Sequence, residues 1–251
     1  MTETERTHHN KVNVLSVYFD NVSMTDMTHD INQFFNQPHD ENLFIVTANP
    51  EIIDYATMHP DYLRLINRAN YVVPDGTGIV LASKILRTPL QTRVPGIELM
   101  EACLSLANER HQRVYLLGAK QEIVREAQNR LSQRFPNVTF ASHHGYIDVE
   151  DDQIAQDIQQ FNPDYLFVGM GYPKQEQWIE RFQSHFSQTV CIGIGGAIEV
   201  FSGAKKRAPK LFQRLNIEWI YRVLIDWKRL NRLQSIPRFL VKVMKQKLRR
   251  S

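Results

Sequence analysis

The sequence predicts an α/β protein with a Rossmann-like, mostly parallel sheet covered by helices, because short strand patterns alternate with longer helical ones. Seven β-branched or apolar runs predict strands: VNVLSVYF (12–19), LFIVTA (43–48), YVV (71–73), RVYLLGA (113–119), VTFASHH (138–144), YLFVGMG (165–171) and TVCIGIGG (189–196). Helical patterns fall between them at about 24–36, 50–69, 77–86, 97–110, 120–134, 150–161 and 174–185. Such βα alternation is typical of a parallel sheet with helices on both faces.

Composition limits the class of protein. A chain of 251 residues with 43% apolar residues can bury a substantial core. Its two cysteines, Cys103 and Cys191, lie in a predicted helix and a predicted strand, so neither a disulfide framework nor a zinc cluster is indicated. The amino terminus lacks a signal-peptide pattern, and no run reaches the roughly 18 apolar residues of a membrane span. We therefore expect a cytoplasmic protein.

Charge divides the chain into two parts. Residues 204–251 hold fifteen Lys and Arg against two acids, a charge of +13, whereas residues 1–203 hold fifteen against twenty-five, a charge of −10. The sequence thus predicts a Rossmann-like body over 1–203 and a basic helical carboxy-terminal appendage over 204–251. An acidic body with a basic tail favours an anionic partner that only the tail meets.

The appendage is predicted to contain two helices, at about 209–233 and 238–249, separated at Pro237. An apolar stripe runs along the first at steps of three or four: Phe212, Leu215, Trp219, Val223, Trp227 and Leu230. At about 100° per residue, three arginines gather on another face: Arg222, Arg229 and Arg232. These features suit either an active part of the site or a solvated helix packed on the body.

Polar residues close several predicted strands, and the carboxyl ends of parallel strands are where open α/β sheets bind ligands. Thr47 and Asn49 follow the second strand, Asp75 the third, Gln175 the sixth and Glu199 the last. These groups are expected to meet at one rim. Each also has a plainer interpretation, since turn and helix-start chemistry explains Thr47, Asn49 and Gln175.

Asp75 and Arg93 have two interpretations each. Asp75 precedes a helical pattern and would make a good N-cap. Its place at a strand end beside apolar residues would instead partly desolvate the carboxylate and raise its pKa toward that of a general base. Arg93, in the turn TRVPG, is either a surface charge or a ligand clamp.

No cofactor or metal site is predicted. The run GIGGAIEVFSG has Ile198 where the dinucleotide fingerprint needs its third glycine, which argues against a standard NAD site. The acids of DVEDD (148–152) are better interpreted as first-turn acids of a helix. His143 and His144 are adjacent on a strand, so their side chains should point to opposite faces.

Seven motifs together resemble those of the WecG/TagA/CpsF family of glycosyltransferases, in the family's order and spacing: TANPEI, VPDGTGIV, TRVPGIEL, VYLLGAKQEI, NPDYLFVGMGYPKQEQWI, GIGGAIEVFSG and KRAPKLFQRLNIEWIYRVLIDWKRLNR. The resemblance is greatest to the branch acting in wall teichoic acid synthesis. It implies inverting transfer of N-acetylmannosamine from UDP-N-acetylmannosamine (UDP-ManNAc) to the 4-hydroxyl of GlcNAc on undecaprenyl diphosphate, without a cofactor.

The resemblance also implies residue roles. Asp75 matches the proposed base that deprotonates the acceptor hydroxyl. The substrate-binding positions of the family match Thr47, Asn49, Arg93, Gln175, Arg222, Arg229 and Arg232. Glu199 stands where the family often has an aspartate, and Ile198 where it often has phenylalanine, so the acid is kept but lengthened.

The basic tail suggests where the protein acts. Its lysines and apolar stripe suit the anionic cytoplasmic face of the membrane, where a polyprenyl-diphosphate-GlcNAc acceptor resides. Two alternatives stay open: a different donor, such as UDP-ManNAcA or UDP-glucose, or a nucleotide- or nucleic-acid-binding module. Few groups in the tail are spaced to read bases, so we expect no nucleic-acid partner. An exposed apolar appendage also allows a homo-oligomer.

Overall fold

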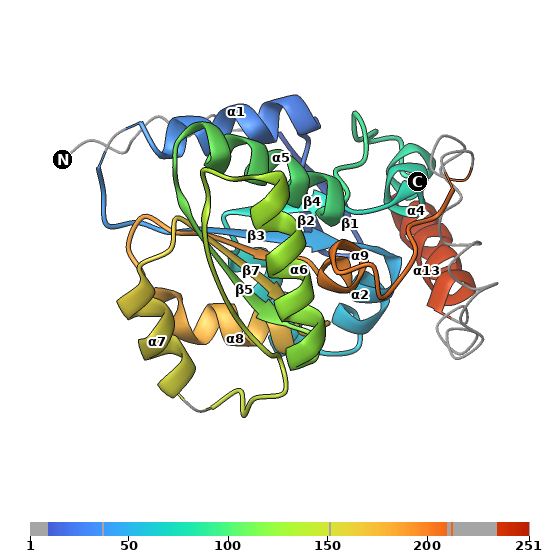
Figure 1. The fold of residues 1–251 in the computed structure, drawn as a ribbon. Coiled ribbons are helices and arrows are strands. Elements are labelled where there is room, and N and C mark those ends of the chain that lie inside the picture. The colour runs from blue at the N-terminus through green and yellow to red at the C-terminus, as the bar shows by residue number, and fades with distance from the viewer. Residues whose placement is uncertain (1–9, 37, 151, 210–211, 213–234, 251) are drawn as a thin grey trace.

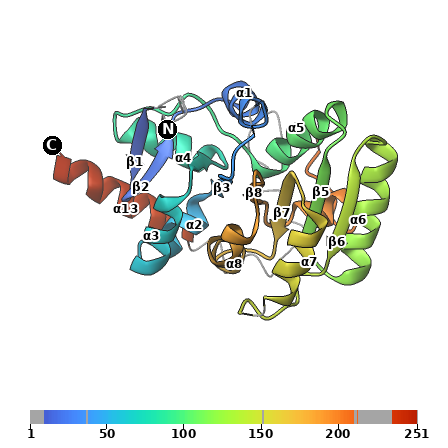
Figure 2. The same cartoon turned by 90° about the vertical axis from the view of Figure 1, so that its left-hand side faces the viewer.

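The computed structural model describes residues 10–36, 38–150, 152–209, 212 and 235–250 (Figure 1). Its centre is a six-stranded, fully parallel sheet, which confirms the predicted fold class. Across the sheet the strands follow the order β4 (Tyr71–Pro74), β3 (Leu43–Ala48), β8 (Val190–Gly193), β7 (Tyr165–Gly169), β5 (Arg113–Gly118) and β6 (Thr139–His143). Figure 2 shows β3, β8, β7, β5 and β6 side by side.

Helices cover both faces of this sheet (Figure 1). One face carries α2 (Pro50–Ala56), α3 (Pro60–Arg68), α4 (Thr77–Ile85), α7 (Gln153–Phe161), α8 (Lys174–Phe182) and α13 (Ser235–Arg250). The other carries α1 (Met24–Phe34), α5 (Gly96–Glu109), α6 (Gln121–Arg134) and α9 (Ala197–Phe201). A 3₁₀ turn, η1 (Gln183–His185), follows α8.

Apart from the edge strand β6, the strands of this sheet are nearly continuous apolar runs, because both of their faces are buried. In β3, Phe44 and Val46 enter the core under α2 and α8, while Leu43 and Ile45 enter the core under α1 and α5. Alternate side chains therefore build two separate cores from one strand.

The first predicted strand is in fact a hairpin, and this corrects the prediction of one strand over 12–19. Strands β1 (Lys11–Val14) and β2 (Val17–Asp20) pair antiparallel as a separate two-stranded sheet. Leu15 and Ser16 make the turn with φ of 53° and 68°. Two left-handed residues give the turn whose twist suits a hairpin, but Leu-Ser lacks the Asn-Gly signal that usually reveals one.

Two further differences from the predicted helices involve prolines. The helix predicted over 50–69 is divided into α2 and α3, because the residue before Pro60 is disfavoured in helical geometry and Pro60 is well placed as a first helical residue. Pro237 was expected to precede a helix over 238–249, and it lies inside α13, which the structure describes from Ser235. The short helix α9 was not predicted.

Helix α13 is packed against α2 and α4 (Figure 1). Phe239 and Val243 are 1% and 0% exposed and join the core over α2. The Lys242 ammonium lies 2.7 Å from Oδ1 of Asp54, a carboxylate that is also buried. Gln246 Oε1 accepts a 2.9 Å hydrogen bond from the backbone N–H of Leu15. The division of the chain at residue 203 stays a prediction, and α13 shares its core with the other part.

Among the residues that the structure describes, no helix is long and apolar enough to cross a membrane. The predicted helix over 209–233, with Arg222, Arg229 and Arg232, lies outside the described residues apart from positions 209 and 212.

Candidate active site

The carboxyl ends of the parallel strands form one rim, as the sequence predicted, and several helices begin there. Three rim glycines have positive φ and open space above them. Gly76 follows β4, Gly171 follows β7 and Gly195 follows β8, with φ of +106°, +79° and +51°. A Cβ built on any of the three would meet nothing within 4 Å. Backbone without side chains therefore faces open space along this edge, which allows a ligand to approach closely.

Thr47 lies near the end of β3 and is buried. Its hydroxyl donates a 2.8 Å hydrogen bond to the carbonyl of Gly193, the last residue of β8. The first residue of α5, Gly96, packs so tightly that a Cβ there would lie 2.9 Å from Thr47 Oγ1. Thr47 thus joins two strand ends to the start of α5 and fixes the middle of the rim.

Asn49 is the N-cap of α2, where its Oδ1 accepts a 3.0 Å hydrogen bond from the backbone N–H of Ile52. This is the turn chemistry considered from the sequence, and such a cap contributes about 1 kcal/mol to helix stability. Because Oδ1 faces the helix, Nδ2 is the part of this half-buried side chain that can contact a ligand.

Asp75 follows β4 directly, and its backbone N–H donates a 2.9 Å hydrogen bond to the carbonyl of Ala48 at the end of β3. The N-cap of α4 is Gly76, so Asp75 stands one residue before the cap position that the alternative interpretation gave it. The residue is half-buried, between buried Pro74 and the open space over Gly76. The backbone of Asp75 is therefore fixed at the rim, next to the open space over Gly76.

Arg93 is brought to Asp75 by backbone pairing, since the N–H of Val94 donates a 2.8 Å hydrogen bond to the carbonyl of Pro74. Its guanidinium lies 3.4 Å from Oε1 of Glu98, in the first turn of α5. Arg207 lies 3.0 Å from the same carboxylate oxygen. Glu98, which the sequence analysis did not single out, therefore holds two arginines beside the rim.

Gln175 is buried, and both ends of its amide are engaged within the protein. Its Oε1 accepts hydrogen bonds from the backbone N–H groups of Gly171 at 3.2 Å and Gly195 at 3.1 Å. Its Nε2 donates a 2.7 Å bond to Oε1 of Glu176. The predicted substrate-binding role of Gln175 stays a prediction, and the geometry shows it tying two rim loops together.

Glu176 was missed by sequence reasoning, although it lies in the quoted motif YPKQEQW. Its carboxyl is fully buried. Burial raises the pKa of Glu176 to about 7, against hydrogen bonds from Gln175 and from the backbone that lower it. The only signal in the sequence was an acid in the first turn of a helix, which is usually an exposed residue favoured by the helix dipole.

Glu199, in α9, forms an ion pair of 2.9 Å with Lys205 through Oε1. Its Oε2 is buried and has no hydrogen-bond partner within the described part of the chain. The roles proposed for Arg222, Arg229 and Arg232 concern residues outside that part.

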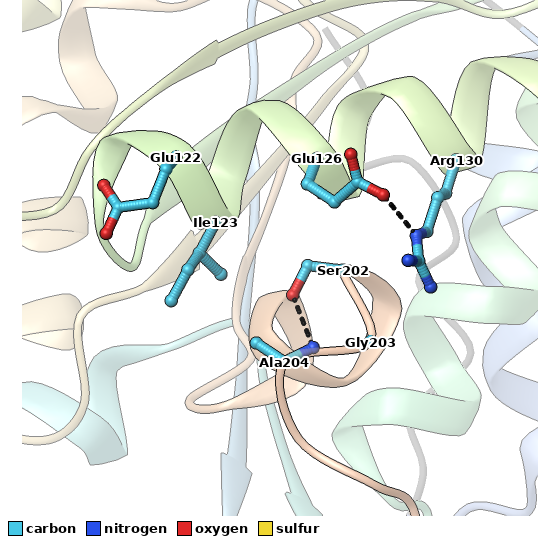
Figure 3. Close-up of a pocket in the computed structure, with 7 residues that line it drawn as sticks. All are labelled: Glu122, Ile123, Glu126, Arg130, Ser202, Gly203 and Ala204. Carbon is cyan, nitrogen blue, oxygen red and sulfur yellow. Dashed lines mark hydrogen bonds and ion pairs between the residues drawn. The ribbon is translucent and has the colours of Figure 1, made fainter.

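Two other features bear on the site. Within the described ranges, no group of three His, Cys, Asp or Glu is arranged to hold a metal ion. An open hollow between α6 and α9 is lined by Glu122, Glu126, Arg130, Ile123 and 202–204 (Figure 3). Its two glutamates outnumber its arginine, so it would repel a diphosphate, and none of the predicted site residues lines it.

An open parallel sheet with an acid, an arginine and glycine loops at its carboxyl rim is typical of Rossmann-like enzymes, which bind their ligands at that edge. The chain belongs to the glycosyl transferase WecG/TagA/CpsF family, whose sequence model matches residues 12–251. The resemblance inferred from the motifs is thereby confirmed.

Curated relatives from Staphylococcus aureus are named N-acetylglucosaminyldiphosphoundecaprenol N-acetyl-beta-D-mannosaminyltransferase. Those of strains NCTC 8325 / PS 47 and MW2 are each 57% identical to this chain over 247 residues, which is 98% of this chain and 97% of theirs. That of strain MRSA252 is 56% identical over the same length and the same shares.

Proposed function

We propose that this protein transfers N-acetylmannosamine from UDP-ManNAc to the 4-hydroxyl of GlcNAc-diphospho-undecaprenol, an early step of teichoic acid linkage-unit synthesis. The observation that carries the proposal is 57% identity over 98% of the chain to transferases named for this sugar and this acceptor. The rim supports it with an acid, an arginine and open glycine loops at the carboxyl ends of the strands.

The reaction joins the acceptor oxygen to the anomeric carbon as the bond from that carbon to the diphosphate oxygen breaks. UDP leaves, the configuration at the anomeric carbon inverts, and the proton of the acceptor hydroxyl goes to Asp75. Asp75 suits this role because β4 and the Ala48 carbonyl fix its backbone beside the open space over Gly76. General-base catalysis of this kind contributes about 10²- to 10⁴-fold to a rate.

Charge that develops on the departing diphosphate needs stabilisation. Arg93 is held beside Asp75, and α4, α5 and α8 all begin near the rim, so their positive amino ends lie toward it. The N–H groups of α5 start next to Thr47. By the family resemblance, Arg222, Arg229 and Arg232 add further positive charge, and the proposal needs no metal.

We also infer that α13 contacts the cytoplasmic surface of the membrane. Val241, Met244 and Leu248 are 55%, 47% and 72% exposed. At 100° per residue, they share one face of the helix, opposite buried Phe239 and Val243. Lys245 and Arg249 are exposed beside this apolar face. An apolar face bordered by basic residues is the pattern of a helix that lies in an anionic membrane surface.

The decisive experiment measures UDP release from UDP-ManNAc with a short-chain lipid-diphosphate-GlcNAc acceptor in EDTA. UDP-ManNAcA, UDP-GlcNAc and UDP-glucose are assayed in parallel. We expect release only with UDP-ManNAc and only when the acceptor is present. Release with another donor would identify the alternative activity, and no release from folded protein with any donor, even with Mg²⁺, would refute the proposal.

Membrane contact is tested by sedimentation with phosphatidylglycerol-rich and phosphatidylcholine vesicles. We expect binding to the anionic vesicles only, and a loss of at least tenfold in partitioning for Leu248→Asp. Equal partitioning of the wild type and this variant would remove α13 as the membrane contact.

A further inference from the structure

Glu176 is an unusual residue for its surroundings. It is fully buried in the first turn of α8, where the helix follows the loop at the end of β7. Fully buried glutamates are almost always paired with a cation. Within the part of the chain that the structure describes, the groups that interact with this carboxyl are instead neutral, namely Gln175, Tyr62 and the backbone of residue 176. Burial of this carboxyl costs desolvation free energy, so we expect Glu176 to have a specific role.

The contact that Glu176 does make is with Gln175. Its Oε1 accepts a 2.7 Å hydrogen bond from Nε2 of that amide. Gly193 lies against the pair, since a Cβ there would be 2.7 Å from Gln175 Nε2 and 3.3 Å from Glu176 Oε1. The amide and the carboxyl are therefore packed directly against the end of β8.

An amide has two possible orientations, and Glu176 selects one. With Nε2 toward Glu176, the amide oxygen faces the N–H groups of Gly171 and Gly195 and accepts from both. The reversed amide would place its NH₂ against these two donors and its oxygen against the carboxyl. Both sets of contacts would then be lost, leaving buried polar groups unpaired at about 1–3 kcal/mol each.

The two glycines that Gln175 holds are the backbone of the rim. Gly171 and Gly195 have positive φ and open space where a side chain would be, so their loops face the region of the sugar nucleotide. A hydrogen-bond network thus connects Glu176, through Gln175, to the loops after β7 and β8. Glu176 itself is buried and reaches no ligand.

We propose that Glu176 is a positioning residue for the donor subsite: it fixes the Gln175 amide so that one oxygen holds the two glycine loops in the geometry that binds the UDP-sugar. This inference deepens the proposed function and rests on it. What Glu176 must supply is a hydrogen-bond acceptor at Oε1, not a negative charge.

Tyr62, from α3, is the other polar group that faces this carboxyl. Its hydroxyl approaches closely enough to lower the pKa of Glu176, although neither that hydroxyl nor Glu176 Oε2 makes a hydrogen bond of good geometry among the described residues. Oε2 is therefore the oxygen that can change without disturbing Gln175. An amide NH₂ in its place would have the Tyr62 hydroxyl as an acceptor.

This distinction gives the test two variants. Glu176→Gln keeps an acceptor for Gln175 Nε2 and removes the charge, whereas Glu176→Met has similar volume and no comparable acceptor. Glu180→Met is the matched control, because Glu180 lies one turn further along α8 in a surface ion pair with Arg68. Each variant is assayed for kcat and for the KM of UDP-ManNAc, and its amide hydrogen exchange is followed over peptides containing Gly171 and Gly195.

We expect Glu176→Met to lose about 10- to 100-fold in kcat/KM, mostly through the donor KM, since a displaced substrate contact costs up to about 10²-fold. Exchange at both glycines should rise by tenfold or more in this variant. Glu176→Gln and the control should stay within about threefold of the wild type in both measurements. If the Met variant does not fold, Glu176→Ala removes the same acceptor in a smaller side chain, with the same expected result.

Two outcomes would overturn the proposal. Wild-type donor KM and wild-type exchange at both glycines in the Met or Ala variant would show that the loops do not depend on Glu176. A loss in Glu176→Gln equal to that in Glu176→Met would show that the charge matters, not the acceptor. Hydrogen exchange needs no substrate, so it tests Glu176 even if the transfer assay fails and the proposed function with it.

Discussion

Replacing Phe239 with alanine tests whether α13 is part of the protein's core or a detachable appendage. The Phe239 ring is 1% exposed and packs in the core that also contains α2, α3 and α8. Truncating a buried phenylalanine removes its transfer free energy and leaves a cavity, together costing about 3–5 kcal/mol. Whole domains are stable by only about 5–15 kcal/mol. The substitution should therefore remove a large share of the free energy of unfolding.

The assay is urea unfolding followed by circular dichroism, with Met244→Ala as the matched control. Met244 lies on the same helix, five positions further on, and is 47% exposed. Its truncation should change the free energy of unfolding by no more than about 0.5 kcal/mol. If Phe239→Ala shifts the midpoint no more than Met244→Ala, the core contacts of α13 contribute nothing, and residues 1–203 are an independent unit.

Three further substitutions test other parts of the structure. Asp75→Asn should bind UDP normally and lose about 10²- to 10⁴-fold in turnover. The control Asp61→Asn, on the exposed surface of α3, should keep its turnover. Near-normal turnover of Asp75→Asn would show that Asp75 is not the base. Lys242→Met should lower the free energy of unfolding in urea by about 2 kcal/mol, because the buried carboxylate of Asp54 loses a charged hydrogen bond of 2.7 Å. An unchanged free energy of unfolding would show that the attraction between the two charges only offsets the cost of desolvating them. Burial raises the pKa of Glu176 from 4.5 to about 7, so the folded state binds the extra proton and this contribution to stability is present below pH 4.5 and lost by pH 7. In the wild type, the free energy of unfolding should therefore fall by about 3 kcal/mol between pH 4.5 and pH 7 because of Glu176, and Glu176→Gln should abolish this fall. The same pH profile of unfolding in the wild type and the variant would contradict the raised pKa.

The parallel sheet and its rim could be predicted because strands that alternate with helices run parallel, so their carboxyl ends lie at one edge of the sheet. Apolar runs that end in Thr47 and Asp75 are sufficient to place both side chains at the carboxyl edge. The hairpin at Leu15 was not predictable in the same way, since its turn residues carry no local signal. Its geometry is imposed by pairing between β1 and β2.

The directions in which side chains point could not be predicted from the sequence. Gln175 stands at the predicted helix start, but whether it faces the ligand or the loops depends on Gly171 and Gly195, which are near it only in the folded chain. Burial of Glu176 likewise arises from the packing of α8 on α3. The charge of the tail predicted an appendage that meets an anionic partner, and charge alone could not reveal that Phe239 enters the core.

The two faces of α13 have a joint consequence. Its inner face is fixed to α2 by Phe239, Val243 and the pair between Lys242 and Asp54. Helix α2 begins at Pro50, directly after its N-cap Asn49 on the rim. If the outer face lies on the membrane as proposed, the rim is held in one orientation relative to the bilayer before any substrate arrives. Because α13 is already folded, the free energy that its outer face gains from membrane contact is not reduced by the entropic cost of folding a disordered helix. A lipid-linked acceptor, whose diphosphate sits at the membrane surface, would then meet a rim whose orientation is already fixed.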